Sequence, residues 1–457
     1  MSLNNEIKKY SGIGEGKKYL INSMGCQMND HDSEKISYIL ENMGYRPTDN
    51  IEDSDLIIFN TCLVRENAEL KVFGQLGALK NLKRKNPDLV IGICGCMPQR
   101  KNIRDYITSK IKHVDLIFGT NNIHKLPQLI YTYLQTGETV IDIIEDTREI
   151  VEDINYNRKY NYKAFVNIMY GCNNFCTYCI VPYTRGREYS REPKNILREI
   201  EMLADEGCKE VTLLGQNVNS YGKTLDNPMT FAELLREVNK IEGIERIRFM
   251  TSHPKDMSEE LIYAMRDCEK VCEHLHLPVQ SGSNILLEKM NRKYTVEHYL
   301  DLIEKTKKEI PNIALTTDII VGFPGETESD FLDTLELVKL VKYDSAFTFL
   351  YSMREGTIAA KMDNQIPDDL KHERFQRLLD TLNPISYENN KKYMDKIVEV
   401  LVEDISKTDE SVLSGRTRTN KLVHFEGSKE LIGKFVDVKV TDFKTFTMEG
   451  NIVKPSN

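Results

Sequence analysis

Short apolar segments alternate with helical stretches over most of this 457-residue chain, and this alternation restricts its fold more than any other feature. In the first part of the chain, four apolar segments indicate buried strands, at Lys18–Asn22, Asp55–Phe59, Leu89–Ile93 and Val114–Phe118. The stretches between them have the length and periodicity of helices, at Asp30–Met43, Arg65–Lys85 and Gln99–Ser109. Strands that alternate with helices in this way predict an α/β fold, a parallel sheet with helices on both faces.

A second series of the same kind begins near Lys163 and continues for about 220 residues. Its expected strands are Ala164–Met169, Glu210–Leu214, Arg246–Met250, His274–Pro278, Ala314–Val321 and Ala346–Tyr351. Its expected helices are Pro193–Glu206, Thr230–Ile241, Ser258–Asp267, Ser283–Met290, Val296–Ile310 and Glu328–Val341. Six strands joined by helical crossovers predict a partial (βα)6 barrel, whose active site would lie at the C-terminal ends of the strands.

The tail changes character again. Four segments alternate apolar and polar residues between turn signals, at Lys396–Glu403, Lys421–Phe425, Phe435–Val440 and Thr445–Val453, which predicts a small antiparallel β-barrel. Acidic residues crowd the stretch between the two strand–helix series, namely Glu138, Asp142, Glu145, Asp146, Glu149, Glu152 and Asp153. We therefore expect an N-terminal domain at 16–136, an acidic connector at 137–160, a barrel at 161–387 and a tail domain at 388–455.

Cys172, Cys176 and Cys179 form a C-x3-C-x2-C loop directly after the first strand of the second series. Three thiolates so close in sequence can ligate three irons of a [4Fe–4S] cluster, whose usual complement is four cysteines. The fourth iron would keep an open coordination position, which activation of a small molecule at a metal requires. The spacing differs from the C-x2-C-x2-C of electron-carrying ferredoxins and disfavours a simple redox carrier. A non-catalytic iron–sulfur electron carrier or RNA-binding module stays as the alternative of a different class.

Cys26, Cys62 and Cys96 form a second set, because each follows the end of an expected strand of the first series. The carboxyl ends of parallel strands meet at one edge of the sheet, so these cysteines can come together although they are far apart in sequence. The alternative is three buried core thiols, since free cysteine is a common core residue. Cys94 falls within an expected strand and is expected in the core.

The ten cysteines are not expected to form disulfides. The N-terminus is polar and no apolar run is long enough to cross a membrane, so we expect a cytoplasmic protein without a membrane segment, in which clustered cysteines bind metal. The net charge of −9 does not indicate a nucleic-acid-binding protein, but it leaves room for local basic clusters.

With both cysteine sets in view, the chain resembles the radical S-adenosylmethionine (SAM) methylthiotransferases along nearly its whole length, and within them the MiaB type. The resemblance rests on the stretches Tyr170–Arg191, Gly25–Asn29, Asn60–Glu69 and Leu213–Gly222, which are long and nearly contiguous matches. The first ~15 residues lie outside it.

The resemblance implies two [4Fe–4S] clusters, one on Cys172, Cys176 and Cys179 and the other on Cys26, Cys62 and Cys96. It implies that the first cluster cleaves SAM to a 5′-deoxyadenosyl radical, and that the second delivers the methylthio group. It also implies an RNA-binding TRAM domain in the tail and a low-potential electron donor such as flavodoxin or ferredoxin. Radical chemistry of this kind belongs to cofactors, and accordingly no side chain stands out as a catalytic acid or base.

The activity implied is the addition of a methylthio group to C2 of N6-isopentenyladenosine beside the anticodon of tRNA. Relatives that modify threonylcarbamoyl-adenosine in tRNA, or an aspartate of a ribosomal protein, are the alternatives. The stretches Asn60–Glu69 and Leu213–Gly222 favour the first activity.

Residues that contact the cofactor or the RNA are harder to assign. By resemblance, Gln216 and Asn217 occupy the segment that recognises the amino group of SAM, and Ser281 and Gly322 lie in loops expected at its ribose and adenine; plain turns are the alternative. Cations expected at RNA phosphates flank the cysteine loop or form a basic run in the tail: Arg185, Arg187, Arg191, Arg416, Arg418 and Lys421. Solvated surface residues are the alternative for each. Nothing assigns His253 a catalytic role.

Overall fold

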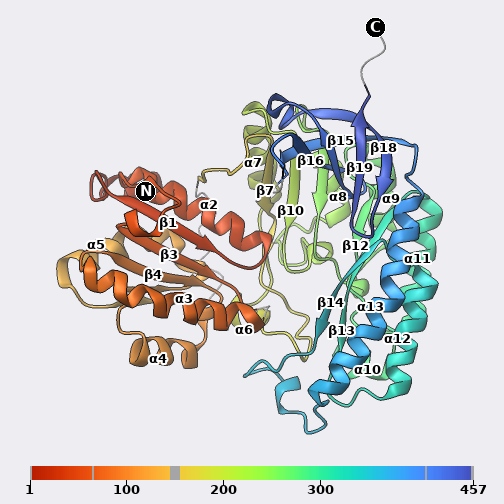
Figure 1. The fold of residues 1–457 in the computed structure, drawn as a ribbon, viewed down its shortest axis with the longest axis horizontal. Coiled ribbons are helices and arrows are strands. Elements are labelled where there is room, and N and C mark those ends of the chain that lie inside the picture. Colours follow the sequence, from red (N-terminus) through yellow and green to blue (C-terminus); the bar gives the residue numbers. More distant parts are fainter. Residues whose placement is uncertain (1–2, 64–65, 145–154, 407–408, 454–457) are drawn as a thin grey trace. The chain divides into compact units, whose positions relative to one another are not determined.

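The computed structural model describes residues 3–63, 66–144, 155–406 and 409–453, and the chain divides into two compact units (Figure 1). Unit 1 comprises residues 1–160, 169–173 and 179–191, and unit 2 comprises residues 161–168, 174–178 and 192–457. The division runs through the C-x3-C-x2-C loop, so that Cys172 and Cys179 belong to unit 1 and Cys176 to unit 2. The acidic residues Glu145, Asp146, Glu149, Glu152 and Asp153 of the expected connector lie outside the described residues.

Unit 1 contains a six-stranded sheet in the order β2-β1-β3-β4-β5-β6, and all of its strand pairs are parallel. The four predicted strands are confirmed as β1 (Lys18–Ser23), β3 (Leu56–Thr61), β4 (Val90–Gly95) and β5 (Leu116–Phe118). The sequence did not indicate the edge strands β2 (Arg46–Pro47) and β6 (Val140–Asp142), which are only two and three residues long. An antiparallel pair, β8 (Met169–Tyr170) and β9 (Tyr189–Ser190), frames the cysteine loop.

Helices cover both faces of this sheet. The core on one face joins α2 (Gln27–Asn42) and α5 (Leu126–Thr136) to inward residues such as Ile58. The core on the other face joins α3 (Glu66–Lys85) and α4 (Lys101–Lys110) to Ile57 and its neighbours. Successive strand residues point to opposite faces, and every residue of β3 and β4 is buried, which explains why these strands are continuously apolar in sequence. Short helices α1 (Leu3–Lys8) and α6 (Val181–Thr184) complete the unit.

Unit 2 begins with the predicted partial barrel. Its six strands form two parallel three-stranded sheets, β11-β10-β7 and β12-β13-β14, joined by a parallel bridge between Ile247 and Val271. The strands are β7 (Lys163–Asn167), β10 (Glu210–Leu214), β11 (Arg246–Phe249), β12 (His274–His276), β13 (Ala314–Val321) and β14 (Ser345–Leu350). The predicted crossover helices are confirmed as α7 (Pro193–Asp205), α8 (Phe231–Asn239), α9 (Glu259–Asp267), α10 (Asn284–Lys289), α11 (Val296–Glu309) and α12 (Glu328–Val341).

The two faces of β13 differ in burial. Leu315, Thr317 and Ile319 are buried, whereas Thr316 and Asp318 on the opposite face are only half-buried. That second face carries polar contacts to β12, from His274 to Thr316 at 3.0 Å and from His276 to Asp318 at 3.4 Å. On β13 the outer face is therefore buried, and the inner face, which carries Thr316 and Asp318, is partly open.

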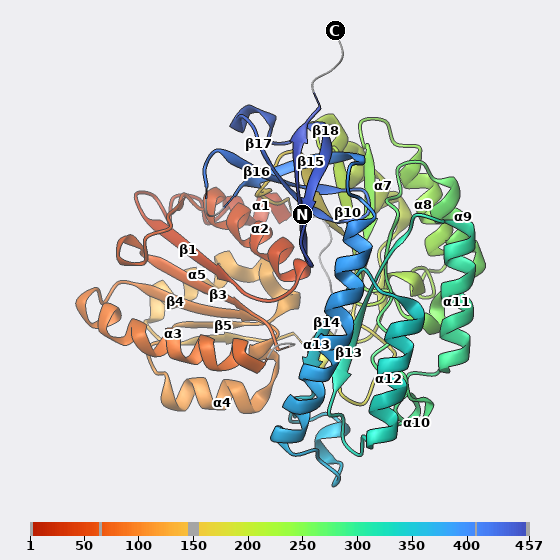
Figure 2. The same ribbon diagram turned by 45° about the vertical axis from the view of Figure 1, so that its right-hand side comes forward.

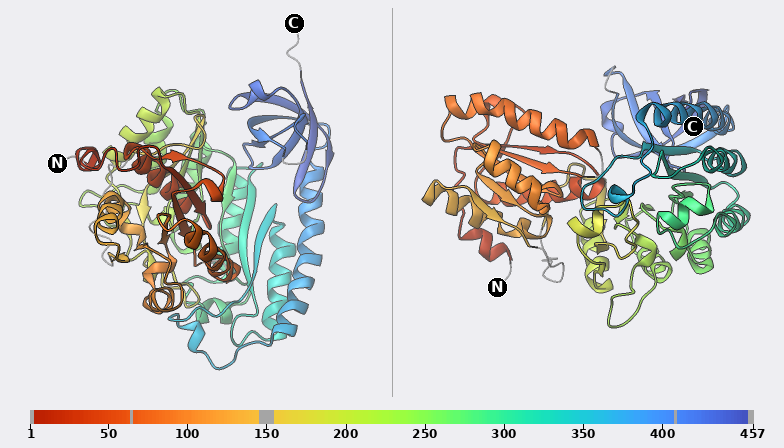
Figure 3. Two further views of the ribbon diagram at one scale, coloured as in Figure 1. Left: turned by 60° about the vertical axis from the view of Figure 1, so that its left-hand side comes forward. Right: turned by 90° about the horizontal axis from the view of Figure 1, so that it is seen from below.

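A helix that the sequence did not predict, α13 (Asp368–Lys391), packs along α12 and β14 and leads into the tail (Figures 2 and 3). The tail is a closed five-stranded barrel in the order β15-β16-β17-β19-β18. Its strands are β15 (Ile397–Ile405), β16 (Val412–Thr417), β17 (Leu422–Glu426), β18 (Phe435–Phe443) and β19 (Thr447–Ile452). The predicted barrel is thus confirmed, with one parallel pair, β17 with β19, and with β16 as a strand not predicted. None of the described helices is long and apolar enough to cross a membrane.

Candidate metal centre and cofactor site

Cys26, Cys62 and Cys96 follow three adjacent strands of unit 1, β1, β3 and β4. Backbone hydrogen bonds join the segments that carry them, from Met24 N–H to the Asn60 carbonyl and from Cys96 N–H to the Thr61 carbonyl, both at 2.9 Å. Gly25 lies so close to Cys62 that an added Cβ atom would stand 2.9 Å from the sulfur, which explains the glycine there. Burial and the nearby Cys26 raise the pKa of the Cys96 thiol. The three cysteines therefore lie at one edge of the sheet, as expected; Cys94 is in the core, and Cys62 and Cys96 are buried as well.

Two asparagines, which the sequence did not single out, hold this edge together. The Asn29 amide donates to the carbonyls of Met24 at 2.8 Å and Thr61 at 2.9 Å. The Asn60 amide donates to the Asn29 carbonyl at 2.7 Å. Satisfied buried amides of this kind fix the backbone around the cysteines.

Arg185 does not lie where the RNA prediction requires it. Its guanidinium is buried in unit 1, where it donates to Asn29 Oδ1 at 2.6 Å and Asp32 Oδ2 at 3.3 Å and lies near Cys96. Burial acts to lower the pKa of Arg185, but the charges of Cys96 and Asp32 hold it above its usual range. Arg191 is buried as well, so both residues are withdrawn as phosphate contacts because their charges face the interior. Arg187 is exposed, and its RNA contact stays a prediction.

Unit 1 offers three thiols, the ligand type of an iron–sulfur cluster, and the binding of a cluster by them stays a prediction. Among the described residues, no three His, Cys, Asp or Glu side chains converge closely enough to hold one metal ion. A cubane cluster is larger than an ion, so the thiolates around it stand farther apart, and thiolates are the ligands it requires. Three thiols on one edge, with a cationic guanidinium beside them, meet this requirement.

In unit 2, Cys176 is held by the turn that follows α10. The Asn291 amide donates to the carbonyls of Asn174 and Phe175 at 3.1 Å, and the Thr177 hydroxyl donates to the Lys289 carbonyl at 2.9 Å. Phe175 has a φ of 47°, a left-handed conformation that few non-glycine residues adopt and that clusters at functional sites. These contacts fix the backbone on both sides of Cys176.

Arg292 connects Cys176 to the end of β12. The side chain is 4% exposed, and its guanidinium donates to Cys176 Sγ at 3.5 Å and to the Pro278 carbonyl at 2.6 Å. Its Nε donates to the Tyr294 hydroxyl at 3.0 Å, which donates in turn to the Val279 carbonyl at 2.7 Å. The sequence did not indicate Arg292, because nothing in its local pattern differs from that of a surface arginine.

Buried polar atoms without hydrogen-bond partners among the described residues gather beyond the ends of β10 and β11. They are Asn217 Oδ1, Ser252 Oγ and His253 Nε2, in residues that are each at least 96% buried. Asn217 is oriented by its amide, which donates to Asp256 at 2.8 Å. His253 Nδ1 accepts from Lys255 N–H, so the proton resides on Nε2, and burial lowers the pKa of this ring well below its usual value. Such orphaned groups fit a polar ligand like SAM, because burying them unpaired is costly.

The other residues expected at the cofactor also follow strand ends. Ser281 lies beyond β12, where its hydroxyl contacts Thr334 and accepts from Ser283 N–H. Gly322 follows β13 with a φ of 77°, and its N–H donates to Glu326 at 3.1 Å. Gln216 is half-buried directly beyond β10. These residues lie at the C-terminal ends of the barrel strands, where the sequence predicted the site. Their contact with the cofactor stays a prediction.

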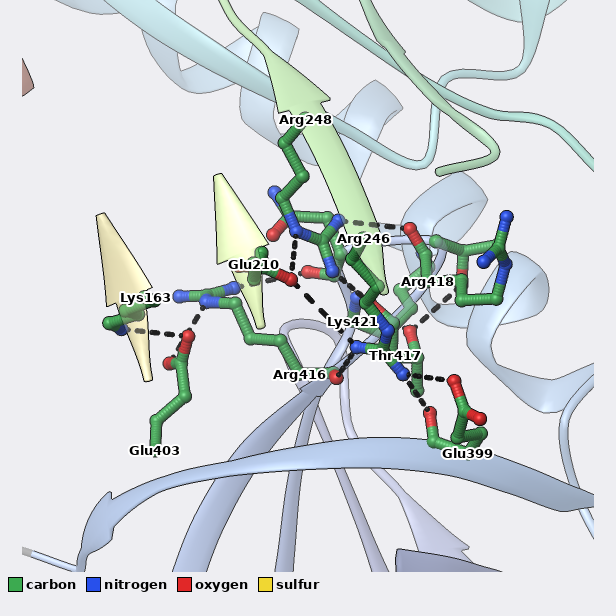
Figure 4. A network of polar contacts seen from close by, with 12 residues as sticks. Lys163, Glu210, Arg246, Arg248, Glu399, Glu403, Arg416, Thr417, Arg418 and Lys421 are labelled. Carbon is green, nitrogen blue, oxygen red and sulfur yellow. Dashed lines mark hydrogen bonds and ion pairs between the residues drawn. The ribbon is translucent and has the colours of Figure 1, made fainter. Parts of the chain in front are cut away.

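The predicted cations of the tail lie at the seam between the C-terminal barrel and the first residues of the barrel strands (Figure 4). Arg418 pairs with both oxygens of Glu273 at 2.8 Å, and Lys421 pairs with Asp344 at 2.7 Å. Arg246 donates across the same seam to the Arg416 carbonyl at 2.8 Å. All three residues thus pair with carboxylates of their own chain; Arg416, whose side chain is 39% exposed, lies 3.5 Å from Glu403. RNA contact by these three residues stays a prediction.

The sequence matches three known families in series. Residues 18–119 match the uncharacterized protein family UPF0004, residues 166–338 the radical SAM superfamily, and residues 391–453 the TRAM domain. The first range contains all strands of the unit 1 sheet except β6, the second contains most of the partial barrel but not β14, and the third contains the closed C-terminal barrel.

Relatives of the full length carry one name. The chain is 60% identical to the tRNA-2-methylthio-N(6)-dimethylallyladenosine synthase of Clostridioides difficile, over 97% of this chain and 93% of the relative. It is 61% identical to the synthase of that name from Alkaliphilus oremlandii, over 98% and 95% of the two chains.

Among solved structures, the radical SAM methyltransferase TsrM from Kitasatospora setae shares the fold, with a TM-score of 0.57, 14% identity and 75% coverage of each chain. Membership of the radical SAM superfamily implies SAM and a [4Fe–4S] cluster as cofactors. Similarity at this level over the full length shows that the chain belongs to the radical SAM methylthiotransferase family, MiaB type.

Proposed function

We propose that this protein adds a methylthio group to C2 of N6-isopentenyladenosine beside the anticodon of tRNA. The observation that carries the proposal is that both cysteine sets occur in this chain, which is 60% identical over 97% of its length to a tRNA-2-methylthio-N(6)-dimethylallyladenosine synthase. The TRAM match supports tRNA as the substrate. An adenosine in the anticodon loop is unpaired, so it can enter a site without the opening of a duplex.

The cofactors supply the radical and the sulfur, and the chain holds and orients them. Cys172, Cys176 and Cys179 would hold the first cluster, which together with SAM would supply radical chemistry. Arg292 orients Cys176, while Asn217 and His253 offer a hydrogen-bond acceptor and a donor to the polar groups of SAM. The C2 hydrogen of adenine is not acidic, so its replacement calls for radical chemistry rather than for a side-chain base.

Cys26, Cys62 and Cys96 would hold the second cluster, which would supply the transferred sulfur, while a second SAM would supply the methyl group. The gathering of these thiols on one sheet edge supports this assignment, as does the Arg185 guanidinium beside Cys96. A low-potential donor of the flavodoxin or ferredoxin class delivers the electron, and the reaction takes place in the cytoplasm.

The substrate is tested with the anaerobically reconstituted protein, SAM and a reductant. Three acceptors are compared: tRNA that carries N6-isopentenyladenosine, tRNA that carries threonylcarbamoyl-adenosine, and a ribosomal-protein peptide that contains the aspartate. We expect the methylthio product from the first acceptor alone, by mass spectrometry. A product from another acceptor contradicts the substrate assignment, and a lack of 5′-deoxyadenosine favours an electron carrier.

The second cluster is tested by replacing one of its ligands. Cys62→Ala should lower the iron content by about half while cleavage of SAM to 5′-deoxyadenosine continues, because the first cluster stays intact. Cys94→Ala is the matched control, since this thiol lies two residues from Cys96 but belongs to the core and should not affect iron. An unchanged iron content in Cys62→Ala would assign the three thiols to the core instead.

A further inference from the structure

A cavity of about 180 Å³ lies in unit 2, between the C-terminal barrel and the inner face of β12, β13 and β14. His274, Thr316 and Phe347 line it from the inner face, and Arg416 and Phe446 line it from the C-terminal barrel. A cavity of about 150 Å³ is enough to hold a benzene molecule. This one therefore has room for one aromatic ring system.

Two phenylalanines at the cavity are more exposed than large apolar side chains usually are. Phe347 on β14 is 51% exposed, and Phe446, in the turn between β18 and β19, is 66% exposed. Phe347 stands edge-on to the buried His276 ring, with 5.7 Å between the ring centroids, so it is positioned by packing. Exposed aromatic faces are the platforms on which unpaired bases stack.

The polar side chains at the cavity complement the remaining parts of a nucleotide. The Arg416 guanidinium is 39% exposed and is oriented by a hydrogen bond to the Asn420 carbonyl at 3.0 Å. Asn390 also lines the cavity; it is 1% exposed, and its Oδ1 has no hydrogen-bond partner among the described residues. The Asn390 amide donates to the carbonyls of Lys444 and Thr445 at 2.7 and 3.0 Å, so the orientation of the unpaired oxygen is fixed.

The charges at the cavity favour an anionic ligand. Lys421 and Asp344 neutralise each other in an ion pair of 2.7 Å, which leaves the Arg416 cation in excess. Glu403, which lies 3.5 Å from Arg416, is also paired with Lys163 at 2.9 Å. A cation beside two aromatic faces and an amide acceptor matches the phosphate, the base face and the amino group of a nucleotide.

We propose that this cavity binds one unpaired nucleotide of the RNA substrate, different from the adenosine that is modified. The cavity reaches the first residues of β12 and β14, whereas the residues proposed to bind SAM follow the opposite ends of the barrel strands. The inference rests on the proposed RNA substrate, and it identifies a second point at which that RNA is held.

The test uses the full-length protein and an anticodon stem-loop RNA with 2-aminopurine placed at each unpaired position in turn. We expect quenching of fluorescence on binding at one position other than that of the modified adenosine. Phe347→Leu and Phe446→Leu should each abolish this quenching and weaken RNA binding about tenfold, because a stacked base contributes binding that leucine cannot replace. Phe446→Tyr should retain both, and Tyr263→Leu, which removes a 37% exposed aromatic outside the cavity, should change neither.

Quenching that survives in both leucine variants would overturn the proposal, and so would quenching that is lost equally in Tyr263→Leu. Formation of 5′-deoxyadenosine in the absence of RNA should equal that of the wild-type protein in every variant, which shows that the barrel is intact. Binding is measured without turnover. Failure of the methylthio transfer with quenching retained therefore refutes the proposed chemistry alone, and the reverse result refutes the cavity alone.

Discussion

Two buried arginines lie near cysteines that we expect to bind iron: Arg292 donates to the sulfur of Cys176, and Arg185 lies near Cys96. A positive N–H donor at a ligand sulfur stabilises the more negative, reduced state of a cluster, since hydrogen bonds to the sulfurs help to set its potential. Each arginine also binds oxygens nearby and is therefore held in place in the protein.

We predict that Arg292→Ala makes the first cluster harder to reduce. The loss of a hydrogen bond between charged groups, about 1.5 kcal/mol, corresponds to a shift of about 60 mV to more negative potential for one electron. The measurement is a redox titration followed by electron paramagnetic resonance. Arg292→Lys should recover part of the shift because it keeps the charge, and Arg266→Ala, on the exposed surface of unit 2, should leave the potential unchanged. Equal potentials in Arg292→Ala and the wild-type protein would contradict this role.

At this scale, strand position predicted that the unit 1 cysteines lie at one edge of the sheet, and iron binding by the six cysteines stays a prediction. The sequence could not predict the contacts of the two arginines. Arg292 lies 116 residues from Cys176, and Arg185 lies 156 residues from Asn29, so these contacts exist only once distant segments meet. For the same reason, Arg185 and Arg191 resembled surface cations in the sequence although their side chains are buried.

The loop between β13 and α12 contains a carboxyl group with an unusual environment. Glu326 accepts from Gly322 N–H and pairs with Arg374 at 2.8 Å, yet burial outweighs both contacts and raises its pKa from 4.5 to about 7. The folded protein therefore binds this proton more tightly than the unfolded chain does. The stabilisation is complete below pH 4.5 and is lost as the pH rises through about 7.

We predict that Glu326→Gln removes this dependence on pH. Relative to the variant, the wild-type protein should lose about 3 kcal/mol of stability as the pH rises from 4.5 to 8. The measurement compares thermal midpoints of the two proteins across this range. Glu328→Gln is the control. Arg377 lowers the pKa of this exposed neighbour, so Glu328 changes its charge, and with it the stability, only at a lower pH. Parallel curves for Glu326→Gln and the wild-type protein would exclude the raised pKa.

Elements with strong periodicity were predicted nearly residue for residue, among them β10, β13 and α12. The missed elements have physical reasons. α13 is rich in charged residues and contains Pro384, which weakens its helical pattern. In β16, alternate positions carry Ser414 and Arg416, and Gly415 interrupts the apolar side of the strand.

At the scale of unit 2, a charged seam joins the C-terminal barrel to the partial barrel. Arg246 is 1% exposed, lies over the Phe435 ring at 4.6 Å and donates to Glu399 at 2.7 Å. Arg248 lies two residues after Arg246 on the same strand, β11, and donates to the Thr417 carbonyl at 2.7 Å. A net charge of −9 gave no sign of these cations, because composition does not reveal which charges become buried.

We predict that Arg418→Ala loosens this seam. The variant loses two hydrogen bonds to Glu273 and one each to the Glu269 and Val271 carbonyls, which together should lower stability by about 1–2 kcal/mol. A double-mutant cycle with Glu273→Gln, read by thermal unfolding and limited proteolysis, isolates the pair. Lys429→Ala, which breaks a solvent-exposed pair in the C-terminal barrel, is the control and should have little effect. Additive effects of the two substitutions would show that the pair does not couple the barrels.

The central claim, methylthiolation of a tRNA adenosine by two clusters, is tested most directly by nucleoside mass spectrometry. The measurement uses tRNA from a strain that lacks this gene and from the same strain complemented with variants. We predict that 2-methylthio-N6-isopentenyladenosine is absent from the deletion strain and is restored by the wild-type gene, but by neither Cys176→Ala nor Cys62→Ala. Intact 2-methylthio-N6-isopentenyladenosine in the deletion strain would contradict the account.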